Sequence, residues 1–271
     1  MYLRRSTAAL VLATMVTMAA TAARDAHAQG DATSQRDTSV RTTVSGDLGY
    51  VTFNNDIEAW RTASVSLSHR NRRGSIIGRV NVASRFGTSG AQVEADAYPR
   101  LGNGRYLYLN AGLSGSSIFP GQRFGAELYT NLPDAWEASI GLRALWFDGS
   151  PVTLYTGTIG KYAGNYWLSL RPFVRIMPTG TSASAGLTVR RYTADADNYF
   201  GGRVSFGSSP SDNVTPDAVA RTSSASFNLQ GSRTFGTSYI GTWSAGHDTE
   251  GLEGGRTRNS WTFSAGIAYR Y

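Results

Sequence analysis

Apolar and polar residues alternate strictly along most of the chain. In the last segment one face is apolar and mostly aromatic while the other is small or polar: Trp261, Phe263, Ala265, Ile267, Tyr269 and Tyr271 against Thr262, Ser264, Gly266, Ala268 and Arg270. Residues 136–147 repeat the pattern. Because successive side chains of a β-strand point to opposite faces, each such segment predicts a strand with one apolar and one polar side.

The alternation predicts fourteen strands. Twelve is the alternative, because Gly157, Gly160 and Pro172 indicate bulges and a weak hairpin could merge. Connections after the even-numbered strands are short, and the two longest connections, 209–220 and 248–257, follow odd-numbered strands, as in outer-membrane barrels. The strands are expected to begin near Val40, Ala59, Ile76, Gln92, Arg105, Arg123, Trp136, Val152, Tyr166, Thr181, Asn198, Ser223, Tyr239 and Arg258.

Aromatic residues stand at both ends of the apolar faces. Trp136 and Trp146 are ten residues apart, and so are Trp261 and Tyr271. Ten residues of a strand tilted by about 45° span about 24 Å, close to the apolar band of about 25 Å in an outer-membrane barrel. We therefore expect an all-β protein, a transmembrane antiparallel up-and-down β-barrel rather than a soluble sandwich, with Trp136, Trp146, Trp261, Tyr269 and Tyr271 at the membrane interfaces.

The first residues predict a secretory signal peptide. Arg4 and Arg5 precede a run of small apolar residues over 8–23, and a cleavage site of the form Ala-x-Ala ends at Ala28. A membrane anchor is the alternative, but the apolar run is short for a span. We expect a signal peptide over 1–28, cleaved after Ala28, a polar lead-in over 29–39, and a barrel over 40–271 in the outer membrane of a bacterium with two membranes.

Composition limits the chemistry of the chain. Of its 271 residues 17% are charged, below the roughly 25% of soluble domains. The absence of cysteine excludes disulfides, thiolate metal sites and a cysteine nucleophile. The net charge of +7 comes almost entirely from arginine, since Lys161 is the one lysine. These arginines are spread singly, and no glycine loop fits a phosphate, so we expect no nucleic acid, no cofactor and no metal.

Several runs in the second half of the chain are more specific than alternation. They are Arg123-Phe124-Gly125-Ala126-Glu127-Leu128-Tyr129, Trp136-Glu137-Ala138-Ser139-Ile140-Gly141-Leu142-Arg143, residues 155–167 leading to Leu170-Arg171-Pro172, residues 190–199, and Gly207-Ser208-Ser209-Pro210. The chain resembles the YaiO-type outer-membrane barrel domain in these runs, over about Gly49 to Tyr271. The resemblance implies an outer-membrane barrel of a kind found in exopolysaccharide and cell-envelope contexts.

Charged residues of the central strands fall on the polar, inward phase. They are Glu94, Asp96, Arg123, Glu127, Glu137, Arg143, Arg171, Arg175 and Arg190. Charges on the lipid face cost about 2–4 kcal/mol at mid-depth, so this sorting follows from the barrel itself. The residues form either a lattice of ion pairs that closes the barrel or the lining of a charged pore. Symmetric pairing about the 131–134 turn would bring Arg123 beside Arg143 and Glu127 beside Glu137, which predicts a positive band and an anion preference.

Three classes of function stay open. The first is a pore or conduit for a small solute or for an envelope or exopolysaccharide glycan, and the second is a closed structural or envelope-interaction barrel without conductance. The third is an outer-rim hydrolase around His247, with Asp248 and Glu250 close to it. His69 and His247 both fall on the apolar face, away from a lumen, so we assign no catalytic residue and expect no enzyme.

Three partners are expected. Outer-membrane lipid surrounds the barrel, and the solute or glycan passes through it if the lumen is open. The barrel-assembly machinery is expected to recognise the aromatic strand that ends in Tyr271.

Overall fold

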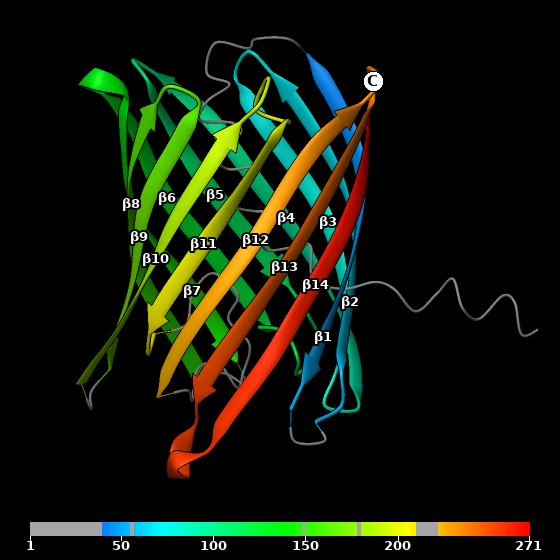
Figure 1. Ribbon diagram of the computed structural model, residues 1–271, viewed down its shortest axis with the longest axis vertical. Helices are drawn as coiled ribbons and strands as arrows, with labels where there is room; N and C mark the ends of the chain where they lie inside the picture. The colour runs from blue at the N-terminus through cyan, green and yellow to red at the C-terminus, as the bar shows by residue number, and fades with distance from the viewer. Residues whose placement is uncertain (1–39, 55–56, 148–149, 178–179, 210–221) are drawn as a thin grey trace, which may run out of the picture.

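Fourteen strands form one closed antiparallel sheet (Figure 1) in the part of the chain that the computed structural model describes, residues 40–54, 57–147, 150–177, 180–209 and 222–271. Each strand pairs with its neighbours in sequence, and the last pairs with the first. The up-and-down barrel of fourteen strands is confirmed, and the alternative of twelve is wrong. The expected signal peptide and lead-in, 1–39, lie outside the described residues. The strands are β1 (Arg41–Phe53), β2 (Trp60–Asn71), β3 (Gly74–Arg85), β4 (Thr88–Gly102), β5 (Arg105–Leu113), β6 (Gln122–Leu132), β7 (Trp136–Phe147), β8 (Ser150–Ala163), β9 (Tyr166–Met177), β10 (Gly180–Tyr192), β11 (Tyr199–Gly207), β12 (Ser223–Phe235), β13 (Tyr239–Gly251) and β14 (Thr257–Arg270).

The burial pattern of the strands is the reverse of that in a soluble protein. In β3 the polar side chains of Arg79 and Asn81 are each 5% exposed, whereas Ile76 and Val80 on the other face are 57% and 48% exposed. Apolar side chains that face outward and polar ones that face inward suit a lipid exterior and a polar lumen. Among the described residues, no helix is long and apolar enough to cross a membrane.

The two ends of the barrel differ in their connections. At one end, which we call the terminal end, lie the start of β1, the end of β14 and the short turns after even-numbered strands, and this end is uppermost in Figure 1. The opposite end, which we call the loop end, carries the longest connection, 208–222. Tight turns face the periplasm in outer-membrane barrels, so the terminal end is the periplasmic one.

The register between β6 and β7 differs from the symmetric pairing expected for them. A three-residue 3-10 turn, Pro133–Ala135, joins the strands, and Asp134 and Ala135 take positive φ values of 56° and 60°. With this turn Arg123 lies opposite Leu145, and Arg143 lies opposite Gly125. The expected juxtaposition of Arg123 with Arg143, and of Glu127 with Glu137, is therefore wrong.

The bulge expected in β8 and β9 is wrong, because the ladder there loses hydrogen bonds but gains no extra residue. The ladder between these strands is interrupted opposite Pro172, but its register is the same on both sides of the gap, Thr156 pairing with Phe173 and Ile159 with Leu170. Proline lacks the N–H that a ladder bond needs, so it removes a hydrogen bond without adding a residue. A shift of register occurs instead between Arg100 and Gly102, near the turn from β4 to β5.

Removing the second half of β14 is expected to prevent stable insertion. Phe263 to Arg270 pair with Thr43 to Tyr50 on β1 and also with β13. Their deletion leaves two strand edges in lipid, where the unpaired backbone groups find no water. We expect a variant that lacks Phe263–Tyr271 to lose the folded band that shifts on heating in gel electrophoresis of outer-membrane fractions. Unchanged levels of that band would contradict the pairing of β14 with β1.

Candidate functional site

The lumen has two unlike halves. Seven charged inward side chains on β3, β4, β6, β7 and β9 are each at most 7% exposed, and we call them the charged lattice: Arg79, Glu94, Asp96, Arg123, Glu127, Arg143 and Arg171. On β11 to β14 five small polar inward side chains are partly exposed, and we call them the small polar wall: Ser205, Ser226, Thr242, Thr262 and Ser264. Longer inward side chains on the same strands are Arg203 on β11, and Glu250 and Arg258 nearer the loop end of β13 and β14. These two surfaces together form the candidate functional site.

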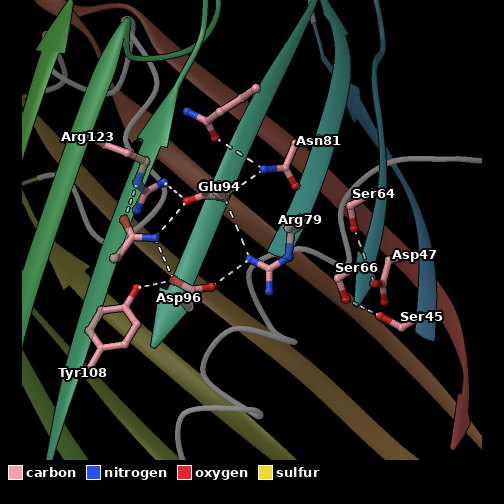
Figure 2. Close-up of polar contacts among 12 residues, drawn as sticks. Ser45, Asp47, Ser64, Ser66, Arg79, Asn81, Glu94, Asp96, Tyr108 and Arg123 are labelled. Carbon is pink, nitrogen blue, oxygen red and sulfur yellow. Dashed lines mark hydrogen bonds and ion pairs between the residues drawn. The ribbon is translucent and has the colours of Figure 1, made fainter. Parts of the chain in front are cut away.

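The first part of the charged lattice is centred on β4 (Figure 2). Glu94 accepts a hydrogen bond of 2.8 Å from Asn81 on β3 and forms an ion pair of 3.2 Å with Arg123 on β6. Asp96 pairs with Arg79 at 3.5 Å and accepts a bond of 3.2 Å from Tyr108 on β5. Both carboxylates are 2% exposed, so buried cations and hydroxyl or amide donors replace the water that each would otherwise bind.

The second part of the charged lattice is centred on Glu127 of β6, which is 1% exposed. Arg143 of β7 donates to this carboxylate at 2.6 Å, and Arg171 of β9 donates to its two oxygens at 3.2 and 3.1 Å. Ser139 donates to it at 2.6 Å, and Arg171 also donates to the Tyr129 hydroxyl at 2.6 Å. One carboxylate thus holds two arginines and joins strands that lie three apart in the sheet.

This arrangement overturns the positive band expected from the sequence. Arg123 pairs with Glu94, while Arg143 and Arg171 share Glu127, so each of these arginines has a carboxylate partner. The anion preference was predicted from arginines without carboxylate partners, so the ion pairs remove the reason for that prediction. Arg175, which the sequence also predicts to face inward, is half-buried on the inward face of β9, two residues nearer the loop end than Phe173.

Aromatic side chains fill the charged half of the lumen near the terminal end. Tyr106 and Tyr129 stack with ring centroids 4.6 Å apart. The Arg190 guanidinium lies between two rings, 5.6 Å from the centroid of Trp167 and 4.7 Å from that of Tyr199. The sequence places Arg190 on the inward phase, but it does not indicate that Trp167 and Tyr199 would be its neighbours.

Glu137 of β7 lies in the same region but is bound quite differently from Glu127. It is 2% exposed, and no hydrogen bond or ion pair joins it to another described residue. The Tyr106 hydroxyl and the Trp167 indole N–H are likewise buried without a hydrogen-bond partner in the described part of the chain. A buried carboxyl group without a hydrogen-bond donor is costly to ionise, so Glu137 contributes less to the stability of the fold than Glu127 does.

A cluster at the loop end escaped the sequence analysis. The Trp60 ring lies between two guanidinium groups, those of Arg85 and Arg258, each 5.3 Å from its centroid. Arg258 also forms an ion pair with Glu250 on the neighbouring strand β13. The phase of β14 already places Arg258 on the inward face, but its contact with β2 depends on closure of the barrel.

The structure places the predicted interface aromatics on the outward face. Trp136 and Tyr269, 38% and 45% exposed, lie near the terminal end, whereas Trp146 and Trp261 lie near the loop end. Tyr271 follows β14 and is 67% exposed. Aromatic side chains at both borders are the ordinary anchors of a barrel in its membrane.

The two histidines in the described part of the chain, His69 and His247, lie away from the lumen. The His247 ring packs outward against Phe227 and Trp261, at centroid distances of 6.2 and 4.8 Å. Asp248 follows it on the strand and therefore points to the opposite face. His69 contacts Thr42, Nδ1 lying 3.0 Å from the hydroxyl. Within the described residues, no cluster of three or more His, Asp or Glu side chains offers a metal site.

Comparison with known proteins assigns the chain to a family. Residues 41–212 match the YaiO membrane beta barrel domain. The chain belongs to the YaiO family. The resemblance stated from the sequence is confirmed, and no curated protein matches the chain.

Solved structures share the fold of this YaiO barrel at low identity. The CymD monoaromatic hydrocarbon channel aligns over 92% of this chain and 93% of its own length, with 9% identity and a TM-score of 0.59. An anion-selective porin from Comamonas acidovorans aligns over 86% of this chain and 99% of its own length, with 10% identity and a TM-score of 0.45. The KdgM porin aligns over 83% and 98%, with 13% identity and a TM-score of 0.42. The family match and the closed sheet identify the YaiO chain as an outer-membrane β-barrel, and CymD shares its fold.

Two buried glutamates of the YaiO barrel provide a matched test of the lattice. Glu127→Gln removes the charge that two arginines share, and we expect it to lower the free energy of unfolding by about 3–5 kcal/mol. Glu137→Gln, almost isosteric and equally buried, changes a carboxyl group whose Oε1 accepts no hydrogen bond, and it is expected to leave stability unchanged or to raise it. Urea titration of the folded band in gel electrophoresis measures both. Equal losses in the two variants would contradict the difference in their surroundings.

Proposed function

We propose that this barrel is an outer-membrane pore that passes small hydrophilic solutes along the small polar wall. The division of the lumen carries this proposal. Long side chains of the charged lattice reach inward from strands between β3 and β9 and are buried against one another, whereas the short side chains of the small polar wall on β11–β14 are partly exposed. A path for solute then lies off-centre, beside the hydroxyl groups.

The small polar wall is continuous from strand to strand. Thr242 lies opposite Gly266, Ser244 opposite Ser264, and Gly246 opposite Thr262 in the pairing of β13 with β14. Ser244 and Ser264 hydroxyls are 2.6 Å apart. Because glycine alternates with serine and threonine, the side chains of this surface extend only a short way into the lumen. Their hydroxyl groups both donate and accept hydrogen bonds.

Hydroxyl groups suit neutral polar molecules and hydrated ions better than apolar ones. They replace part of a solute's hydration shell without binding it tightly, which is what passage needs. The CymD channel is named for monoaromatic hydrocarbons, and its likeness to this chain concerns the fold alone. For this barrel we propose a hydrophilic solute, which includes the small solutes and envelope glycans expected from the sequence.

A closed structural barrel is the second candidate, because the charged lattice and the terminal-end aromatics fill half of the lumen. We propose no catalytic role for the barrel, and the expectation that it is not an enzyme stays a prediction. The outer-rim hydrolase would need His247 beside an acidic partner, but its ring packs among outward aromatic rings. The barrel-assembly machinery also stays an expected partner.

The absence of native cysteine makes the path directly testable. We expect the wild-type barrel to give discrete conductance steps in planar bilayers. Thr242→Cys and Ser264→Cys should react with charged methanethiosulfonate reagents and lose conductance on modification. Ser169→Cys and Thr158→Cys, which are inward but 4% and 5% exposed in the wild type, are matched controls and should neither react nor change.

The outcomes separate the two candidates. Absence of discrete steps from folded wild-type protein would refute the pore and favour the closed barrel. If modification blocks conductance in Ser169→Cys but not in Thr242→Cys, the path runs along β8 and β9 instead of along the small polar wall, and the proposed path is wrong.

Ion selectivity provides a further test. Four arginines of the lattice region, Arg79, Arg123, Arg143 and Arg171, stand among four carboxylates, Glu94, Asp96, Glu127 and Glu137. Opposite charges at such close range cancel in the field that an ion meets beyond them. We expect a reversal potential close to zero in a potassium chloride gradient. A strong anion preference in the wild type would show that other arginines control the path.

A further inference from the structure

The outward face of β7–β12 carries few ionised side chains. All of them are positively charged, and all lie near the terminal end. They are Lys161 on β8, Arg191 on β10 and Arg233 on β12. All three lie within three residues of the terminal end of their strands. Elsewhere on the outward face of these six strands, the described residues include no Asp, Glu, Lys or Arg. The barrel therefore presents three cations, on alternate strands, to one border of the membrane.

Aromatic side chains occupy the strands next to the cations, Trp136 on β7, Tyr166 on β9 and Phe200 on β11. Trp136 lies directly across from Lys161, and Arg191 lies between Tyr166 and Phe200, its direct partners on β9 and β11. Lys161 Nζ is 4.5 Å from the centroid of Trp136, and the Arg191 guanidinium carbon is 5.9 Å from the centroids of both its neighbours. Rings in these positions hold the long basic side chains against the barrel wall.

The three cations have no anionic partner in the described part of the chain. No hydrogen bond or ion pair joins Lys161, Arg191 or Arg233 to another described residue. Rings provide some stabilisation but do not neutralise a charge at the edge of a low-dielectric layer. The anions found at this depth of a membrane are lipid phosphates, which accept charge-assisted hydrogen bonds from arginine and lysine.

We propose that this row of alternating rings and cations is a binding site for anionic glycerophospholipid in the periplasmic leaflet. Lys161, Arg191 and Arg233 bind the phosphate and headgroup oxygens, and Trp136, Tyr166 and Phe200 pack against the glycerol region and the upper acyl chains. The lipid is the source of the phosphate, because the rings offer apolar contact that a free anion does not use. The proposal rests on the fold and is independent of whether the lumen conducts.

Native mass spectrometry of the folded full-length protein in detergent tests this site. The probe is an equimolar mixture of phosphatidylglycerol and phosphatidylcholine with identical acyl chains. We expect the wild type to retain about tenfold more phosphatidylglycerol, and the triple variant Lys161→Gln, Arg191→Gln, Arg233→Gln to fall to within about twofold of parity. Arg61→Gln is the matched control, since Arg61 is an exposed outward arginine near the loop end of β2, and it should retain the preference.

Two further arms keep the test decisive. Inorganic phosphate should not displace phosphatidylglycerol more than chloride does at the same ionic strength, and stronger displacement would mean a free-anion site. Tyr166→Leu with Phe200→Leu should reduce retention of phosphatidylglycerol while the charges remain. Equal retention of the two lipids by the wild type, or an unchanged preference in the triple variant, overturns the proposal. If the triple variant fails to fold, Arg191→Gln alone should still lower the preference.

Discussion

The fold depends on one requirement, that every backbone N–H and C=O inside lipid must find a partner within the protein. A sheet meets this requirement only when it closes, and here β14 completes the ladder by pairing with β1 from Thr43 to Phe53. Closure in turn divides every strand between a lipid side and a lumen side. The exposed Ile76 and the buried Arg79 of β3 show this division, because each would be costly on the opposite face.

Inside the barrel the charged residues are packed as a core would be. Glycine occurs where long side chains cross: a Cβ at Gly112 would lie 2.8 Å from both Arg123 Cγ and Glu94 Cγ, and one at Gly125 would lie 2.9 Å from Arg143 Cδ. The charged lattice thus needs both its ion pairs and the glycines beside them, which leave room for the long side chains. The same close approach occurs on β10 and β11, where a Cβ at Gly186 would lie 2.8 Å from Arg203 Nε and one at Gly201 would lie 2.9 Å from Arg190 Cγ.

The outer surface is organised by the membrane rather than by the lumen. Rings lie at both borders, but the cations Lys161, Arg191 and Arg233 lie at the terminal end alone on β7–β12. The lumen determines what can pass through the barrel, whereas the outward rings and cations determine which lipid binds around it. The lining of the lumen and the outward row of cations both depend on which face of the sheet each side chain occupies and on how far along its strand it lies.

Local pattern determined much of this protein from the sequence alone. Alternation predicted the closed all-β barrel, the starts of the strands to within a few residues, and the inward phase of residues such as Glu127, because a period of two is a property of each strand by itself. Register and partners needed the tertiary structure. The 3-10 turn at Pro133–Ala135 moved Arg143 opposite Gly125, and Arg171 reached Glu127 from three strands away. Such contacts depend on turn geometry and on the curvature of the closed sheet, which no single strand encodes, and they decided that the arginines form ion pairs instead of a positive band.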